Sequence, residues 1–155
     1  MAEGRIEALF VTPEPKADPV AVASATAIAG KGLDGDRYAL ETGTWWKPEK
    51  TGQHITLIDA EVVEGLRAEH GLAITPAGTR RNVVTSGVDL DGLIGHRFWL
   101  GGALCVGVRT CPPCAHLEGL TVPGVRSALE GVGGLRADVL AGGEVAAGDT
   151  IRLAD

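Results

Sequence analysis

The sequence Ala103-Leu104-Cys105-Val106-Gly107-Val108-Arg109 alternates, with the larger apolar side chains at every second position. This run gives the first indication of the fold class. A period of two is typical of a β-strand, and it places Leu104, Val106 and Val108 on one face. Cys105 stands in the middle of the run, so we expect it to be a buried packing residue. The sequence therefore predicts a strand over 103–109.

Similar short runs lie on both sides of this strand, separated by turn residues. They cover 5–11, 54–58, 80–85, 93–100, 137–140 and 149–153. Glycine makes up 23 of the 155 residues, about twice its usual share, and it supplies turns and bulges rather than long helices. Many short strands bounded by turns indicate a mainly β protein with minor α content, a barrel or sandwich rather than a parallel α/β sheet.

Two helices are predicted among these strands. The main helix lies near 59–70, where Asp59 is a good N-cap residue and Gly71 a natural stop. Its apolar stripe consists of Val62, Val63 and Leu66. A second, short helix near 123–131 has proline in its first turn. Between the strands near the C-terminus, Gly142-Gly143 and Gly148-Asp149 are expected to be turns.

Composition narrows the class of protein. The length of 155 residues predicts a single domain over 1–155. A formal net charge of −6 offers no basic face for a nucleic acid. Three cysteines, an odd number, do not make a disulfide framework and favour a reducing compartment. The N-terminus lacks a signal-peptide layout, and the alanine-rich run 19–30 is too short to span a membrane. We therefore expect a cytoplasmic protein without a membrane or nucleic-acid partner.

The motif Thr110-Cys111-Pro112-Pro113-Cys114-Ala115-His116 follows the strand directly and is the most reactive-looking feature. Two cysteines three positions apart, stiffened by prolines, suit a dithiol–disulfide couple or half of a metal site. The βαβ context of a thioredoxin-like pair is missing, and so is the second cysteine or histidine pair of a zinc site. A structural turn with an incidental cysteine remains as the alternative.

Arginines placed near glycine or asparagine form the second feature: Arg37, Arg80, Arg81, Arg97 and Arg109. A guanidinium fork with backbone N–H groups nearby is a good receptor for phosphate, although each arginine taken singly could be a solvated strand-edge residue. Arg109 stands out, because with strict alternation it shares a face with Cys105 and comes just before the cysteine motif. A cation there would lower the pKa of a neighbouring thiol.

Weaker candidates have structural explanations. His54 opens a strand, and capping that strand is the expected role. Trp45 and Trp46 would line a pocket mouth, stack on a planar ligand or cover the edge of the barrel. Asp36 neighbours glycine, as do several other aspartates, and there turn-forming hydrogen bonds explain an aspartate without catalysis.

Taken in order, the segments resemble the MOSC domain, a family named for the C-terminal region of molybdenum cofactor sulfurases. The matching segments are 32–38, 54–59, 80–90, 93–98, 111–118, 133–140, 142–143 and 148–149. They read GLDGDRY, HITLID, RRNVVTSGVDL, LIGHRF, CPPCAHLE, GGLRADVL, GG and GD. Together they cover nearly the whole chain, and the ordered set carries the resemblance rather than any one segment.

The resemblance implies a β-barrel whose essential cysteine lies in a Pro-Cys turn. Pro113-Cys114 matches that turn, so the role passes to Cys114 and not to Cys111. In relatives that bind molybdenum cofactor (molybdopterin), a cysteine thiolate ligates the metal. Arginine and asparagine of an RxN stretch help to hold the pterin phosphate there, which points to Arg80 and Asn82, with Arg37 as a looser match.

Several functions remain open at this level. Cys114 would either ligate molybdenum or carry sulfur as a persulfide, received from a separate pyridoxal-phosphate-dependent cysteine desulfurase. In the second case Cys111 would resolve the persulfide by forming a disulfide. Alternatives are a molybdenum-dependent reductase of N-hydroxylated compounds with an external electron-transfer protein, and a non-catalytic anion-binding module.

Overall fold

The computed structural model describes residues 3–14, 17–43, 46–48, 50–68, 71, 75–111 and 134–154. The predicted mainly β fold is confirmed. The strands are β1 (Gly4–Val11), β2 (Val20–Val22), β3 (Ser24–Ile28), β4 (Gly32–Leu33), β5 (Ile55–Asp59), β6 (Val83–Ser86), β7 (Arg97–Leu100), β8 (Ala103–Thr110), β9 (Leu135–Ala141), β10 (Gly143–Ala146) and β11 (Thr150–Leu153). The helix α1 covers Ala60–Ala68, and the 3₁₀ turns are η1 (Ala77–Thr79) and η2 (Asp91–Leu93).

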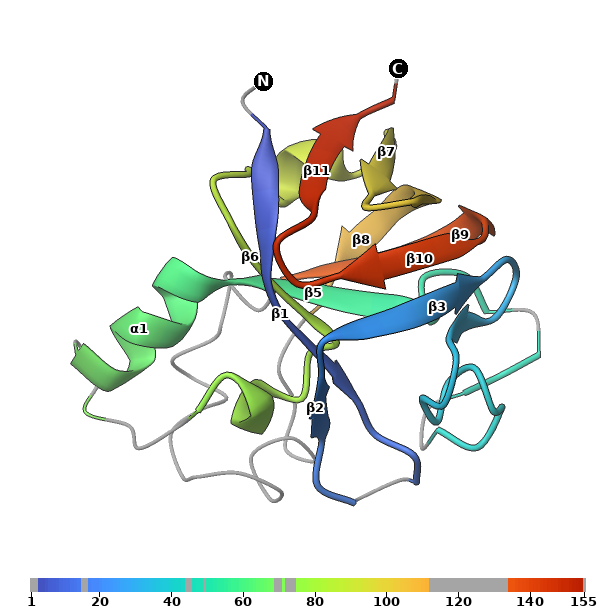
Figure 1. The fold of residues 1–155 in the computed structure, drawn as a ribbon, viewed down its shortest axis with the longest axis horizontal. Coiled ribbons are helices and arrows are strands. Elements are labelled where there is room, and N and C mark those ends of the chain that lie inside the picture. The colour runs from blue at the N-terminus through green and yellow to red at the C-terminus, as the bar shows by residue number, and fades with distance from the viewer. Residues whose placement is uncertain are drawn as a thin grey trace.

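Seven of the described strands close into a barrel (Figure 1). They follow one another in the order β11-β7-β8-β9-β5-β6-β1, and β1 pairs again with β11 to complete the ring. β2 extends the sheet from the far end of β1, while β10, β3 and β4 form a separate small sheet. Closure leaves few strand edges unpaired, which protects a protein made of short strands from edge-to-edge association.

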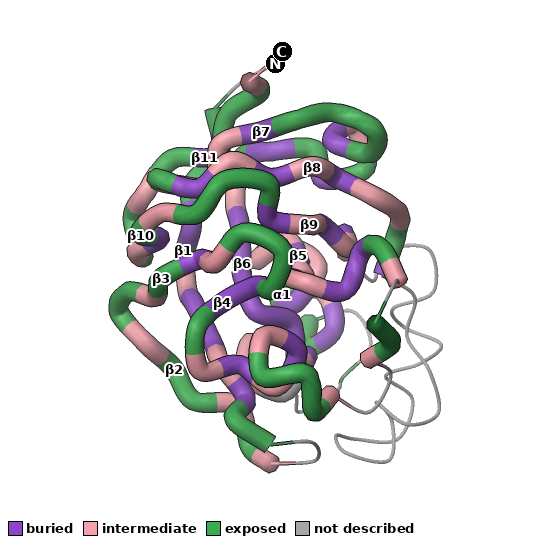
Figure 2. The backbone as a smooth tube through the Cα atoms, turned by 90° about the vertical axis from the view of Figure 1, so that its right-hand side faces the viewer, coloured by how far each residue is buried: buried purple, intermediate pink, exposed green. Residues whose placement is uncertain are grey.

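The barrel interior is the main core. Its fully buried side chains include Ile6, Leu9, Leu57, Phe98 and Leu135. A second cluster lies outside the barrel, where Val63 and Leu66 of α1 pack on outward-facing Ile58 and Val84. The buried segments follow the barrel strands in Figure 2, and the segments between them are largely exposed. The sheet is therefore covered on both faces where α1 lies.

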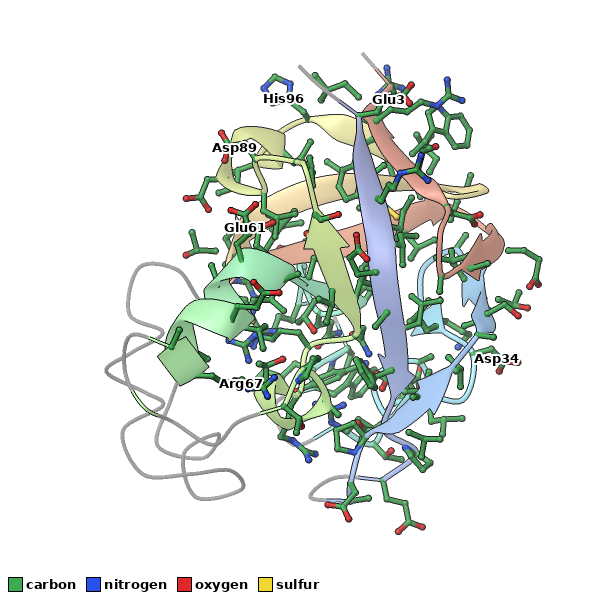
Figure 3. All side chains as sticks on the ribbon, turned by 60° about the vertical axis from the view of Figure 1, so that its left-hand side comes forward. Glu3, Asp34, Glu61, Arg67, Asp89 and His96 are labelled. Carbon is green, nitrogen blue, oxygen red and sulfur yellow. The ribbon has the colours of Figure 1, made fainter. Side chains whose placement is uncertain are left out.

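The two ends of the barrel differ. Glu3, Asp89 and His96 lie at the end that carries both termini, as Figure 3 shows. β1 runs from there to the opposite end, where β2 and η1 lie (Figure 1). We call this opposite end the site end, because most of the predicted site residues lie there or on the adjoining sheet face.

Local differences from the sequence predictions have simple reasons. The strand over 103–109 is present as β8, but its buried side chains are Ala103 and Cys105, while Leu104 and Val106 are only half-buried. Small residues face inward because the interior is filled by larger side chains from the other strands. The alanine-rich run 19–30 contains β2 and β3. Gly143, expected in a turn, begins β10.

The main helix is confirmed over Ala60–Ala68, within the predicted 59–70. The predicted short helix near 123–131 lies outside the described residues. No helix in the described part of the chain combines the length and the apolar character needed to cross a membrane.

Candidate functional site

A row of polar side chains crosses the outer face of the barrel at its site end. Thr56 on β5 pairs with Arg136 on β9, and Arg136 pairs with Arg109 on β8. Thr56 also bonds to Asn82, which precedes β6. The neighbours of these residues on the strands, Leu57 and Leu135 among them, point into the core. Since side chains alternate along a strand, the row itself faces outward.

Asn82 joins three strands with its side chain. Its Oδ1 accepts the backbone N–H of Thr56 at 3.1 Å and the Thr56 hydroxyl at 3.2 Å. Its Nδ2 donates to the carbonyl of Phe10 on β1 at 3.2 Å. The residue is only 5% exposed. Both polar atoms of the amide are therefore engaged, and the geometry makes Asn82 a residue that positions β1, β5 and β6.

Arg81 links the start of β6 to the end of β8. It is buried, with 6% of its surface exposed. Its Nη1 donates to the carbonyl of Thr79 at 3.3 Å and its Nη2 to the carbonyl of Cys111 at 3.0 Å. The N–H of Cys111 in turn donates to the carbonyl of Gly134 at 2.8 Å. Arg81 thus fixes the point at which the chain leaves β8 and enters the cysteine motif.

Asp36 and Arg37 lie beside the end of β1. The carboxylate of Asp36, which is fully buried, accepts the N–H of Thr12 at 2.8 Å and that of Tyr38 at 3.3 Å. The bond to the residue two positions ahead is the turn geometry predicted for this aspartate, which is confirmed. The Arg37 guanidinium lies 3.4 Å from the Asp36 carboxylate and 4.8 Å from the centre of the Tyr38 ring.

Arg80 comes from η1 and is close to Arg37 in space. Its backbone has φ 60° and ψ 20°, the left-handed region that few residues other than glycine adopt. Its Nη1 donates to the carbonyl of Ala17 at 2.7 Å. Burial lowers the pKa of Arg80, and the positive charge of Arg37 lowers it further, although Asp18 and Asp36 act in the opposite direction. Two half-buried guanidinium groups therefore share one location.

Arg109 occupies a different position from the one that strict alternation predicts. A β-bulge lies between Gly107 and Arg109, and it places Arg109 opposite Arg136 on the outer face. Cys105 points into the core, so the two residues do not share a face. The Arg109 Nη1 donates to the carbonyl of Thr51 at 2.8 Å. The premise that linked Arg109 to Cys105 was wrong, and its role toward Cys114 stays a prediction.

The described cysteines are both buried. Cys105 is fully buried, as predicted, and burial raises the pKa of its thiol to about 12, with the charge of Asp138 adding to the effect. Cys111 is 1% exposed. Cys114, the central residue of the prediction, lies outside the described residues, as does Trp45. Among the residues that the structure does describe, no three His, Cys, Asp or Glu side chains gather into a metal site.

Comparisons with known proteins agree with this architecture. The model of the MOSC domain family matches residues 44–152. The chain belongs to the MOSC domain family. A search of curated protein sequences finds no match.

Three solved structures show the same fold as this MOSC domain. YuaD from Bacillus subtilis is 22% identical, with 98% of this chain and 96% of that chain covered and a TM-score of 0.79. YiiM from Geobacillus stearothermophilus is 18% identical, with coverages of 98% and 75% and a TM-score of 0.74. YiiM from Escherichia coli is 20% identical, with coverages of 97% and 70% and a TM-score of 0.66.

Two residues of the MOSC domain were not selected as site residues from the sequence. Arg81 was noted beside Arg80 but not separated from it; the left-handed backbone of Arg80, which ends η1 ahead of β6, has no local sequence signal. Arg136 stands in the GGLRADVL segment and gave no signal of its own. The alternation of Leu135, Arg136 and Ala137 could have revealed that Arg136 faces outward, on the opposite side from its two buried neighbours.

The donor groups at the site end fit part of what the MOSC family is associated with, the molybdenum cofactor. A terminal phosphate needs forked cations in a partly desolvated place. Arg37 and Arg80 are two partly buried cations near one another, and the Asp36 carboxylate lies beside Arg37. A soft thiolate suits molybdenum, and Cys114 is the residue to which the family resemblance assigns that role.

Proposed function

We propose that this protein is a molybdenum-cofactor-binding MOSC domain. In this proposal Arg37 and Arg80 hold the terminal phosphate of the pterin, and the thiolate of Cys114 ligates the metal. The observation that carries the proposal is the pairing of Arg37 and Arg80, brought together from distant parts of the sequence and half-buried at one end of the barrel. The carboxylates of Asp36 and Asp18 offset part of this positive charge, and a bound phosphate would offset more of it.

Each described residue has a distinct task under this proposal. Arg80 is held in its left-handed backbone by η1 and anchored on Ala17, so its position is set before any ligand arrives. Tyr38 supports Arg37 from one side through a cation–π contact. Preorganised donors lose less freedom when they bind, and this increases affinity for the phosphate.

The backbone around Cys111 would position the cysteine turn. Arg81 donates to the carbonyl of Cys111, and the N–H of Cys111 donates to Gly134, so both backbone groups of this residue are fixed. Cys114 follows three residues later in the sequence, and in this proposal Arg81 would set the point from which the cysteine turn starts. When bound, the cofactor would supply a redox-active metal, and the chain's own contribution is to bind, orient and shield it.

The burial of Cys111 favours the ligand role of Cys114 over the sulfur-carrier role. A resolving thiol must reach the sulfur that it attacks. At 1% exposure, Cys111 is packed in the protein and would have to leave its place first. The persulfide hypothesis is therefore the second candidate, together with its cysteine desulfurase partner, and the same experiment can separate the two.

The test is metal and pterin analysis of the protein made in a host that synthesises molybdopterin. We expect wild-type protein to contain molybdenum, Cys114→Ser to lose it, and Cys111→Ser to retain it. Arg80→Gln should lower pterin content at least about tenfold, the loss expected for one charge-assisted contact. Arg152→Gln, on β11 at the other end of the barrel, is the matched control and should behave as wild type.

Two results would contradict the proposal. One is wild-type protein without molybdenum from a host that makes the cofactor, and the other is full molybdenum in Cys114→Ser. A mass increase of one sulfur atom on Cys114, removed by reductant and seen in protein that lacks molybdenum, would establish the carrier function in its place.

A further inference from the structure

A second group of cations is not used by the proposed function. It consists of Lys47, Lys50, Arg109 and Arg136, which we call the loop cluster. Lys47 and Lys50 belong to the loop before β5, while Arg109 and Arg136 are cross-strand neighbours on β8 and β9. The protein as a whole is acidic, with a net charge of −6, so four gathered cations require an explanation.

The loop that carries the two lysines is tied down at several points. Gln53 receives the N–H of Lys47 on its Oε1 at 3.1 Å and donates from Nε2 to the carbonyl of Lys47 at 2.7 Å. The N–H of Gly52 donates to Asp138 at 2.9 Å. Arg109 holds the neighbouring carbonyl of Thr51. The backbone of the loop is therefore fixed against β9 and against the Arg109 side chain.

Gly52 shows how closely Arg109 approaches this loop. Its φ is +73°, and a Cβ atom there would lie 2.9 Å from the Arg109 Nη1. Glycine therefore allows both the turn and the contact with the guanidinium. The nearby cations also affect Lys50. Burial lowers the pKa of its ammonium group, and the positive charges of Arg136, Arg109 and Lys47 lower that pKa further.

Carboxylates do not neutralise the loop cluster in the described part of the chain. None of the ion pairs found there includes Lys47, Lys50, Arg109 or Arg136. The carboxylate of Asp138 lies nearby, where it accepts the N–H of Gly52 and offsets only part of the charge of the four cations. Glu41 pairs with Lys31 at 3.5 Å. The cluster thus keeps an excess of positive charge that a bound anion would offset.

A small pocket adjoins the cluster at Lys50. Its lining also includes Lys31, Glu41, Tyr38, Trp46, Gln53 and His54, and the Glu41 carboxylate pairs with Lys31. The Nδ1 of His54 accepts the backbone N–H of Val139 at 2.9 Å, so this nitrogen carries no proton. Its 3.5 Å contact with Asp138 is therefore not an ion pair, and burial lowers the pKa of the imidazole. The proton lies on Nε2, which has no hydrogen-bond partner among the described residues.

We propose that the loop cluster and the pocket at Lys50 and His54 form a second anion-binding site, specific for a small doubly charged oxyanion of the phosphate type. A group of four cations favours a dianion over a monoanion, since the attraction grows with each ligand charge. His54 would donate from Nε2, and Lys50 would provide the charge closest to the ligand. Tyr38, which lines the pocket, also contacts Arg37, so the site would lie beside the Arg37 and Arg80 pair and accept an anionic substrate or effector next to the cofactor.

The experiment is a titration with inorganic phosphate in a buffer without other multivalent anions, followed by the NMR signals of the His54 ring nitrogens. We expect a saturable shift in wild-type protein, lost in Lys50→Gln and Arg136→Gln. Arg80→Gln should retain it, which separates this site from the cofactor site. Acetate, a monoanion, should bind at least about tenfold more weakly. Ribose 5-phosphate in a parallel titration distinguishes a phosphate ester from the free ion.

Three results would overturn the proposal. The first is a His54 signal that does not respond to phosphate, and the second is a response that Lys50→Gln and Arg136→Gln leave intact. The third is a response lost equally in Arg80→Gln, which would place the phosphate at the cofactor site. Thermal unfolding of each variant without phosphate checks that the substitutions leave the fold in place.

Discussion

Replacing Asn82 by alanine should destabilise the barrel measurably, because its side chain joins β1, β5 and β6. Three hydrogen bonds are lost, to the N–H and hydroxyl of Thr56 and to the carbonyl of Phe10. At about 1 kcal/mol net for each bond, the loss is about 3 kcal/mol. In a domain of this size each kcal/mol lowers the Tm by about 2–4 °C, so Asn82→Ala should lower it by about 6–12 °C.

The assay is thermal unfolding of cofactor-free protein, followed by circular dichroism. Thr56→Val and the double variant complete a cycle that measures the coupling between the two side chains, expected at about 1 kcal/mol or more. Arg152→Gln, an exposed substitution on β11, should change stability by less than about 0.5 kcal/mol. These values are measured without any ligand, so they report on the fold alone.

This reasoning assigns Asn82 a positioning role, while the family resemblance assigns it to the cofactor phosphate. An Asn82→Ala protein that unfolds within about 2 °C of wild type would refute the positioning role. If such a stable variant also lost its pterin, Asn82 would be a direct ligand of the phosphate.

Three further predictions rest on single residues. Gly134 has φ +106°, and a Cβ atom there would lie 2.0 Å from the carbonyl oxygen of Leu57. Gly134→Ala should therefore lower the free energy of unfolding, measured in urea, by at least about 2 kcal/mol. An unchanged free energy of unfolding would contradict this close packing. Burial raises the pKa of Cys105 to about 12, so iodoacetamide at pH 8 should leave it unlabelled in native protein, as peptide mass spectrometry would show. Burial lowers the pKa of His54 in the folded protein below its ordinary value of 6.5. At mildly acidic pH the imidazole therefore binds a proton more readily in the unfolded chain than in the folded one. The free energy of unfolding should fall as the pH drops from about 7 to below the pKa of the folded state. His54→Gln, whose oxygen can still accept from Val139, should flatten this part of the stability profile, and an unchanged profile would exclude His54 as the cause.

The sequence predicted the larger elements because their patterns are local. Alternation in β8 and the apolar stripe of α1 depend only on neighbouring residues, and both elements are present. The small strands β2, β3, β4 and β10 were missed, since a few alanines and glycines carry little strand signal. β2 is a strand because it pairs with β1, and β3 pairs with both β4 and β10, so these strands depend on the whole fold.

The site was harder to predict, because its geometry depends on the register between strands. The bulge before Arg109 turned that side chain to the outer face, and alternation in one strand cannot reveal a bulge that forms against another. Arg80 and Arg37 were selected singly, and only the fold shows that they face one location. The pairing of Arg136 with Arg109 likewise follows from a strand register that no single segment encodes.

The closure of the barrel also has a practical use. Gly4 on β1 pairs with Ile151 on β11, so the first and last strands run side by side and the described chain starts and finishes at the same place (Figure 1). A short flexible linker would span that gap, which makes circular permutation feasible. New termini cut at the exposed Gly102, in the turn between β7 and β8, would leave the paired residues of both strands in place. The order in which the strands are synthesised could then be varied without altering the binding end.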